Sequence, residues 1–314
     1  MEDLNDLAKN INCEAADLSE LLEILDRNEQ ELYRTFYISK KSGGFREISA
    51  PSPKLKEIQK QIKLFIEKFY KPNKAANGFL YNRNILTNSI KHCKKRQVLN
   101  LDLKNFFPSI HLKRVWGMFY NSPFDFNDYI SKILTKLCCF ENRLPQGAPT
   151  SPIITNIICY RLDLRLIDVS KRNFCYYTRY ADDLTFSTTK YCFPTKMENE
   201  ITSIINQEGF EINKDKRRVQ NYWRRQEVTG LTVNKKPNVK RKYVRTIRAV
   251  LHNWLKNGLE EAAHYYSPYG PYYLKRSIKG KIDFVGLIRG KDDEIHKKLL
   301  SEYKLLSNTV TVNV

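Results

Sequence analysis

The chain has no run of apolar residues that approaches the roughly 20 needed to cross a bilayer as a helix. Its opening, Met1-Glu2-Asp3, is acidic and lacks the features of a signal peptide, so we expect a cytoplasmic protein with no membrane partner. Internal repeats, low-complexity tracts and long linkers are also absent, while hydrophobic residues make up 41% of the 314 residues. We therefore expect a folded globular protein whose subdomains pack as one unit.

Cysteine is present, but not in a pattern that would join parts of the chain. The seven cysteines are an odd number, no two form a C-x-x-C pair, and adjacent Cys138 and Cys139 are poorly spaced for one zinc ion. These features argue against a disulfide framework and a structural zinc site. We expect buried, reduced thiols.

Acidic residues are scarce relative to basic ones, 34 against 54, which gives a formal net charge of +20. Residues 1–31 hold ten acidic and two basic side chains, so the remainder carries +28. An excess of this size favours a polyanionic partner, because each neutralised phosphate releases counterions. Solubility alone is the simpler explanation, and charge does not separate nucleic acid from an anionic membrane. The interleaved tyrosines and the absence of a membrane anchor favour nucleic acid.

Hydrophobic periodicity predicts a mixture of helices and strands. Helices are expected over residues 4–32, 55–69, 126–139, 151–167, 196–208 and 243–258, with a helical and basic region from 240 onward. Ser151 and Pro152 are the expected N-cap and first residue of the fourth helix. Strands are expected in a hairpin over 36–48, in a buried run over 98–103, and in two runs, 174–180 and 184–187, joined by a turn.

Three carboxylates lie where expected strands end. Asp182 and Asp183 would repel each other at the turn, so one would be largely neutral unless a cation were bound. A solvated turn explains this pair equally well. Asp102 shifts the balance, because it ends an otherwise apolar strand and buried carboxylates are rare without a partner or a metal. A sheet that places Asp102 beside Asp182 would supply ligands to two Mg²⁺ ions roughly 3.5–4 Å apart.

Three segments, in a fixed order, resemble motifs of the reverse transcriptase family: its first carboxylate motif, its nucleotide-pocket motif and its YxDD box. They are Leu101-Asp102-Leu103-Lys104-Asn105-Phe106-Phe107-Pro108-Ser109, Leu144-Pro145-Gln146-Gly147-Ala148-Pro149-Thr150-Ser151-Pro152 and Tyr180-Ala181-Asp182-Asp183. The resemblance extends from about residue 36 to 235. It implies an RNA-directed DNA polymerase with an α+β right-hand fold. Its implied parts are an N-terminal helical extension (1–35), fingers (36–97), a palm with an antiparallel sheet (98–235, with a fingers insertion at about 112–145) and a small helical thumb (236–314).

The resemblance also implies roles for individual residues. The catalytic and metal-binding set for two Mg²⁺ ions is Asp102, Asp182 and Asp183, with the backbone of Leu103. The nucleotide-binding set, for deoxynucleoside triphosphates, is Arg46, Phe107, Gln146, Gly147 and Lys216. Within it, Phe107 matches the gate that excludes a ribose 2′-OH, whereas neighbouring Phe106 is expected in the core. Gly147 allows a close backbone approach. Lys214 competes with Lys216 for the position near the leaving group.

Two further segments resemble signatures of retron reverse transcriptases. Asn88-Ser89-Ile90-Lys91-His92 resembles an NAxxH signature with serine in place of alanine, and Val228-Thr229-Gly230 matches a VTG signature. This subtype implies reverse transcription of a cognate structured non-coding RNA, self-primed from a guanosine 2′-OH, to give an RNA–DNA hybrid. It also implies anti-phage defence with a separate effector or toxin protein. The alternatives are an intron-encoded, diversity-generating or abortive-infection reverse transcriptase, or a non-catalytic RNA-binding scaffold that restrains a toxin.

A basic run precedes and enters the expected thumb. Residues 214–256 carry fourteen basic side chains against two acidic ones, a net charge of +12, with Tyr222, Trp223 and Tyr243 among them. A solvated face is the ordinary explanation for such a run. We favour contact with RNA and its DNA product, because the family's thumb adjoins the duplex and the aromatic rings offer stacking surfaces. The expected contact residues here are Arg241, Lys242, Arg245 and Arg248, together with Asn88, His92, Val228, Thr229 and Gly230.

Overall fold

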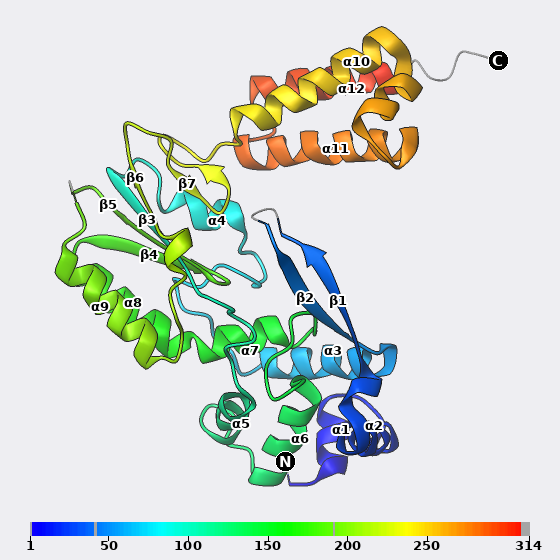
Figure 1. The fold of residues 1–314 in the computed structure, drawn as a ribbon, viewed down its shortest axis with the longest axis vertical. Coiled ribbons are helices and arrows are strands. Elements are labelled where there is room, and N and C mark those ends of the chain that lie inside the picture. Colours follow the sequence, from blue (N-terminus) through cyan, green and yellow to red (C-terminus); the bar gives the residue numbers. More distant parts are fainter. Residues whose placement is uncertain (1, 41–42, 191, 309–314) are drawn as a thin grey trace. The chain divides into compact units, whose positions relative to one another are not determined.

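The computed structural model describes residues 2–40, 43–190 and 192–308, which form two compact units (Figure 1). Within these described ranges, the first unit comprises Met1–Asn84 and Leu99–Val219, and the second comprises Ile85–Val98 and Gln220–Val314. Helices and antiparallel strands occur together in the first unit, so the expected α+β class is confirmed. No helix among the described residues is both long enough and apolar enough to traverse a bilayer.

The first unit contains most of the secondary structure. Its helices are α1 (Leu4–Asn10), α2 (Ala15–Asn28), the 3-10 helix η1 (Glu29–Leu32), α3 (Pro53–Glu67), α5 (Leu112–Tyr120), α6 (Asp128–Cys138), α7 (Ser151–Ile158), α8 (Tyr160–Arg172), α9 (Thr195–Gln207) and the 3-10 helix η2 (Lys214–Lys216). Its strands are β1 (Tyr33–Ser39), β2 (Phe45–Pro51), β4 (Cys175–Tyr180) and β5 (Asp183–Thr188), together with parts of β3 (Gln97–Asp102) and β6 (Arg218–Asn221), which cross the boundary between the units.

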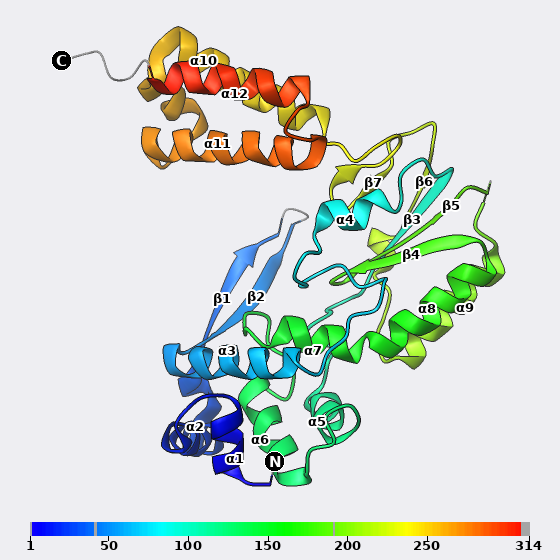
Figure 2. The same ribbon diagram turned by 180° about the vertical axis from the view of Figure 1, so that it is seen from behind.

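A four-stranded sheet in the order β4-β5-β3-β6 positions the three aspartates. Strands β4 and β5 form an antiparallel hairpin in which Tyr180 pairs with Asp183 across a two-residue turn. Strand β3 is buried along nearly its whole length, as expected for the run over 98–103, although Asn100 interrupts its apolar side chains. Helices α8 and α9 lie against one face of this sheet, as the front and rear views both show (Figures 1 and 2).

The second sheet of the first unit is the hairpin β1–β2, paired from Tyr33↔Pro51 to Ser39↔Phe45. It confirms the expected hairpin over 36–48. Its base is tied to the loop before α7, since the Ser49 N–H donates to the Gln146 carbonyl at 3.0 Å. Helix α3 follows directly, with Pro53 in its first turn and an apolar stripe facing the core.

The expected single helical stretch over 4–32 is wrong in one respect, because it is divided into α1, α2 and η1. Asn12, between α1 and α2, has a left-handed φ of 53°, which a continuing α-helix does not allow. Part of the acidic face is engaged rather than free. Lys54 of α3 pairs with Asp17 at 2.8 Å and with Glu20 at 2.7 Å, which anchors α2 to the rest of the unit.

The helix expected over 151–167 is also divided, into α7 and α8, which meet at Cys159. The expected N-cap is displaced by one residue. Thr150 occupies the cap position, while Ser151 is already helical and its hydroxyl donates to the Pro145 carbonyl at 2.6 Å. The hydroxyl therefore holds the preceding loop instead of capping the helix.

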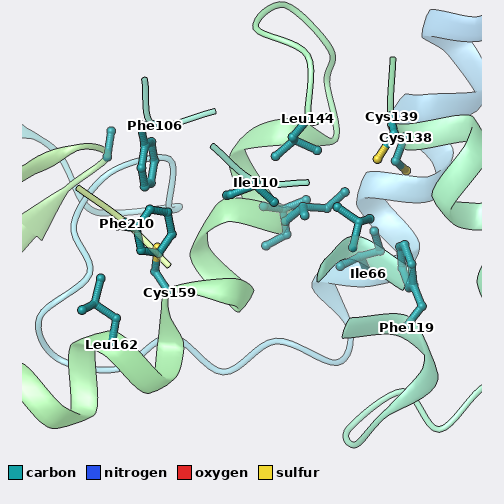
Figure 3. Close-up of a cluster of buried hydrophobic side chains, with 14 of the residues drawn as sticks. Ile66, Phe106, Ile110, Phe119, Cys138, Cys139, Leu144, Cys159, Leu162 and Phe210 are labelled. Carbon is teal, nitrogen blue, oxygen red and sulfur yellow. The ribbon is translucent and has the colours of Figure 1, made fainter. Parts of the chain in front are cut away.

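A large apolar core fills the first unit, and Figure 3 shows part of it. Side chains from α3, α5, α6 and the loop before α7 pack there, including Ile66, Phe119 and Leu144, all fully buried. All seven cysteines are free, as expected. Their burial is uneven: Cys138, Cys139 and Cys159 are buried, the expectation is wrong for the exposed Cys192, and the other three are half-buried.

The second unit contains a helical bundle and a small hairpin. Its elements are α4 (Ile85–Ile90), β7 (Glu227–Val228), β8 (Leu231–Thr232), α10 (Arg241–Tyr266), α11 (Gly270–Arg289) and α12 (Glu294–Asn308). The stripe expected over 243–258 packs in the bundle core through Val244, Ile247, Leu251 and Trp254. Gly258 kinks α10 with a φ of 85°, and the helix resumes beyond it. The helix therefore extends past the predicted end.

Candidate active site

Asp102 lies directly beside the turn that carries Asp182 and Asp183. The Leu103 N–H donates to the Asp182 carbonyl at 3.0 Å, so the end of β3 and the turn are hydrogen-bonded neighbours. On its other side, the Asp102 carbonyl accepts from the Asn213 N–H at 2.8 Å. The backbone therefore brings Asp102 beside an adjacent acidic pair that begins 80 residues later in the sequence.

Burial, and after it the crowding of these carboxylates, raises two of their pKa values. Burial raises the pKa of Asp182, and repulsion by Asp102 raises it further. Asp183 has an exposed side chain, yet the protein around its carboxylate displaces water and raises its pKa to about 7, with repulsion by Asp182 and Asp102 acting in the same direction. The site therefore holds more negative charge than its surroundings balance, a condition that an added cation would relieve.

Three basic side chains act on this negative site: Lys216, Arg46 and Arg218, the last by lowering the pKa of Asp183. Lys216 of η2 places its Nζ 2.9 and 3.0 Å from the two oxygens of Asp102, although its side chain, like that of Lys214 on the same short helix, is exposed. Arg46, on β2, is exposed and close enough for its charge to lower the pKa of Asp182. The structure thus brings Arg46 and Lys216 toward the aspartates from opposite ends of the first unit's sequence.

The donor atoms suit a hard divalent cation, because carboxylate oxygens are the ligands that Mg²⁺ prefers. Among the residues that the structure describes, however, no three His, Cys, Asp or Glu side chains form a ready-made metal cluster. The Asp102 carboxylate bonds the Lys216 ammonium instead. The residues fit Mg²⁺ by chemistry and charge, and metal binding would require Asp102 to exchange this ammonium for the ion.

The turn itself is held in an unfavourable conformation by close packing. Ala181 has a φ of 55°, a left-handed conformation that costs a non-glycine residue roughly 1–2 kcal/mol. Gly78 lies against it: a Cβ on this glycine would come within 2.6 Å of the Ala181 backbone nitrogen. The Asn77 N–H donates to the Arg179 carbonyl at 2.7 Å, and the Arg179 N–H donates to the Ala75 carbonyl at 2.9 Å. Residues 75–78 therefore brace the strand that leads into the turn.

A buried ion pair lies next to the turn and was not anticipated from the sequence. Arg179 and Asp163 are both fully buried, with Nη2–Oδ2 and Nε–Oδ1 distances of 2.7 and 2.8 Å. Burial lowers the pKa of Arg179, but attraction to Asp163, its hydrogen bonds to that carboxylate and smaller contributions from Cys159 and Tyr177 together hold the pKa well above its ordinary value. Removing one partner of such a pair costs roughly 3–5 kcal/mol. The signal in the sequence was an arginine inside the strand expected over 174–180. The structure shows that its neighbours Thr178 and Tyr177 are buried.

The expected nucleotide-binding residues lie on several elements of the first unit. Phe106 is buried and Phe107 is partly exposed, which confirms the expectation that Phe106 belongs to the core. The Phe107 ring lies 6.1 Å from that of Phe79. Gly147 has a φ of 145°, and a Cβ there would lie 2.6 Å from the Ser49 carbonyl oxygen. The close approach that Gly147 permits is therefore to strand β2.

The two retron-like signatures lie together in the second unit. The Thr229 hydroxyl donates to the Ile85 carbonyl of α4 at 3.4 Å, and Val228 packs with Val98, Val233 and the partly buried Cys93. Thr229 and Gly230 both have positive φ, 46° and 83°, as a type I′ turn between β7 and β8 requires. The backbone conformation of this turn therefore explains why a glycine stands at position 230.

The expectation of direct nucleic-acid contact needs a correction for part of these signatures. Asn88, His92 and Val228 are fully buried, so in this structure their side chains offer no surface to a nucleic acid. Thr229 is partly exposed and Gly230 exposed. The side chains of Arg241, Lys242, Arg245 and Arg248 on α10 are all exposed, and contact through them stays a prediction.

An α+β fold that gathers aspartates at a hairpin turn and at the end of a neighbouring strand is the arrangement of template-directed nucleic-acid polymerases. The family model for reverse transcriptase (RNA-dependent DNA polymerase) matches residues 38–256. The retron Ec86 reverse transcriptase of Escherichia coli is 31% identical over 304 residues, which cover 96% of this chain and 88% of that protein. The retron Mx162 reverse transcriptase of Myxococcus xanthus is 36% identical over 254 residues, which cover 70% of this chain and 52% of that protein.

A solved foamy viral protease–reverse transcriptase in complex with double-stranded DNA aligns with 93% of this chain and 44% of that one, with 16% identity and a TM-score of 0.48. The sequence comparisons establish the family. This chain belongs to the reverse transcriptases and, among them, to the retron type. Its activity is RNA-directed DNA polymerisation.

The close approach of Gly78 to the turn makes a first prediction. Gly78→Ala should lower polymerase activity by about 100-fold, because the added methyl group must displace the Ala181 backbone and with it the neighbouring carboxylates. Steady-state incorporation of deoxynucleotides measures this. Gly117→Ala in α5 is the control, since its methyl group would meet only Asn121 Nδ2, at 4.0 Å. Equal activity of the two variants would contradict the bracing role of Gly78.

Burial of His92 makes a second prediction, about stability. Burial, with the charges of Lys91 and Lys95, lowers the pKa of His92 to about 3, whereas an unfolded histidine titrates near 6.5. Between these values the unfolded chain binds more protons, so the free energy of unfolding should fall as the pH drops from about 6.5 toward 3. The expected contribution approaches 1.4 kcal/mol per pH unit.

Denaturant unfolding at several pH values tests this. The His92→Gln variant should show a shallower dependence of unfolding free energy on pH than the parent protein. His252→Gln, which alters an exposed histidine of α10, should keep the parental slope. Parallel pH profiles for the parent and His92→Gln would show that His92 is not held neutral in the folded state.

Proposed function

We propose that Asp102, Asp182 and Asp183 hold two Mg²⁺ ions, with the backbone of Leu103, and that this site extends DNA on a cognate structured non-coding RNA. The observation that carries the proposal is the hydrogen-bonded adjacency of Asp102 and the 182–183 turn. When bound, the metal would promote ionisation of the attacking hydroxyl and neutralise charge developing on the phosphates. The raised pKa values of Asp182 and Asp183 support a cation as the natural partner.

The chain's own side chains bind and orient the incoming deoxynucleoside triphosphate. Arg46 offers a planar guanidinium whose paired donors match phosphate oxygens. The Lys216 ammonium, now on Asp102, supplies positive charge near the pyrophosphate that leaves. Gln146, at the loop tied to β2, contacts the nucleotide, while Gly147 keeps this loop close to the hairpin. Lys216 is preferred over Lys214 because its ammonium reaches the aspartates.

Synthesis begins, in this proposal, from the RNA itself. The 2′-OH of a guanosine attacks the α-phosphate of the first deoxynucleotide, a 2′–5′ bond forms, and pyrophosphate leaves. The product is an RNA–DNA hybrid molecule, which acts in cytoplasmic anti-phage defence with a separate effector or toxin protein. Membership of the retron type supports this scheme. The exposed basic side chains Arg241, Lys242, Arg245 and Arg248 hold the RNA and its DNA copy.

Sequencing the nucleic acid that co-purifies with the protein tests the scheme. Expression of the protein in the cells that supply its cognate RNA should yield DNA joined covalently to that RNA. Asp182→Asn combined with Asp183→Asn should retain the RNA but lower the yield of DNA by at least about 100-fold, because the carboxylates that would hold the metal are lost. Asp168→Asn, which alters an exposed carboxylate paired with Arg172, should leave DNA synthesis intact. DNA synthesis by the double variant would refute the assignment of the site, and DNA without a covalent link would refute self-priming.

Sugar selection makes a separate prediction. Phe107→Ala should raise the efficiency of ribonucleotide relative to deoxynucleotide incorporation by roughly 10- to 100-fold, because the ring that would clash with the 2′-OH is gone. Competition between the two triphosphates on an RNA template measures the ratio. Phe174→Ala is the control, since that ring is exposed and lies against Lys190. A ratio unaffected by Phe107→Ala would remove this residue as the gate.

A further inference from the structure

We infer that Arg179, Asp163 and Asn156 form a positioning device that sets the conformation of the turn carrying Asp182 and Asp183. The inference rests on the proposed function, because it assumes that these two aspartates act in catalysis. None of the three residues is placed at the reacting atoms. Their effect would be exerted through the backbone of Ala181, which lies in the turn, and of Gly78, which packs against it.

The guanidinium of Arg179 is held in one orientation. Its Nε and Nη2 donate to the two oxygens of Asp163 at 2.8 and 2.7 Å, a bidentate contact that fixes the plane of the group. The remaining nitrogen, Nη1, is then directed at the turn. It donates to Asn156 Oδ1 at 3.1 Å and lies 3.4 Å from the Ala181 carbonyl oxygen. The ion pair therefore reaches the backbone immediately before Asp182.

Asn156 carries the contact to the other side of the turn. While its Oδ1 accepts from Arg179, its Nδ2 donates to the Gly78 carbonyl at 3.0 Å. Gly78 in turn approaches the Ala181 nitrogen so closely that a Cβ would not fit. One amide side chain thus links the arginine next to the turn with the segment that packs against it.

Stability alone does not account for this arrangement. A buried ion pair often contributes no more to folding than apolar side chains of the same volume, so its presence is weak evidence for a stabilising role. What it adds is a defined geometry. Ala181 occupies a left-handed conformation without being glycine, and such a residue persists only where its surroundings over-determine it. The three polar side chains supply that determination at the residue next to Asp182.

The network contains its own control. The Tyr177 hydroxyl donates to Asp163 Oδ1 at 2.8 Å, so it takes part in the same buried cluster. Among the described contacts, it bonds to no atom of residues 180–183. Tyr177→Phe therefore removes a buried hydrogen bond from the cluster without removing a contact to the turn. A purely structural cluster would respond alike to Tyr177→Phe and to Asn156→Leu.

The experiment compares Asn156→Leu, Arg179→Lys and Tyr177→Phe in the full-length protein. The measurements are the unfolding midpoint, kcat and KM for deoxynucleotides, and hydrogen exchange of the backbone amides of residues 180–183. We expect Asn156→Leu and Arg179→Lys to lower kcat by about 10- to 100-fold, to change KM by less than about threefold, and to speed exchange in the turn. Tyr177→Phe should lower the unfolding midpoint but keep kcat and turn exchange within about threefold of the parent.

Two outcomes would overturn the inference. One is a folded Asn156→Leu variant whose kcat and turn exchange match those of Tyr177→Phe. The other is a loss of kcat in all three variants in proportion to their loss of stability. If Arg179→Lys does not fold, Asn156→Leu decides the matter alone. The Asp182→Asn variant distinguishes failure of the proposed function from failure of the inference. If Asp182→Asn polymerises normally, the proposed function fails. If Asp182→Asn is inactive and Asn156→Leu keeps the parental kcat, only the inference fails.

Discussion

Repulsion among three carboxylates is the constraint around which the first unit is organised. Left to themselves, Asp102, Asp182 and Asp183 would separate, because like charges in a partly desolvated site raise the free energy of the charged forms. The backbone prevents separation, since the end of β3 is hydrogen-bonded to the turn on one side and to Asn213 on the other. Lys216 and Arg46 relieve only part of the charge, which leaves a site that gains by binding a cation.

Main-chain segments that pack closely against one another hold the mutually repelling carboxylates in place. Gly78 admits the 75–78 segment to the backbone of Ala181, and Gly147 admits its loop to the backbone of Ser49. A Cβ at either glycine would fall within 2.6 Å of a main-chain atom. The turn is thereby joined to its bracing segment, and the loop before α7 to the β1–β2 hairpin, at main-chain level, where hydrogen bonds are directional and side-chain rotamers add no freedom.

The sequence predicted the acidic residues of the site better than the buried residues that hold them in place. Asp102 was recognisable as a carboxylate ending an apolar strand, and the β4–β5 hairpin by two strand-like runs around an acidic turn. The Arg179–Asp163–Asn156 network was missed, because a single sequence shows neither that Arg179 is buried nor that its partner acid lies on α8. Helix breaks at Asn12 and Cys159 were missed for a related reason: tertiary packing overrode an apolar periodicity that continued through both.

The distribution of motifs between the units bears on how a retron reverse transcriptase selects its RNA. The three aspartates, the basic side chains of Lys216 and Arg46 near them, and the braced turn all belong to the first unit. The chemistry of such a site does not depend on which template is copied. Residues 88–92 and 228–230, 136 positions apart at their nearer ends, lie in the second unit, which also carries the exposed basic face of α10. Burial of Asn88 and His92 argues that the first signature shapes this unit from inside, while the strained Thr229-Gly230 turn and the α10 cations form its outer surface. In the proposed scheme, the shape of the second unit contributes to selectivity for the cognate RNA, because double-stranded RNA is recognised mostly by its shape and by contacts to its backbone.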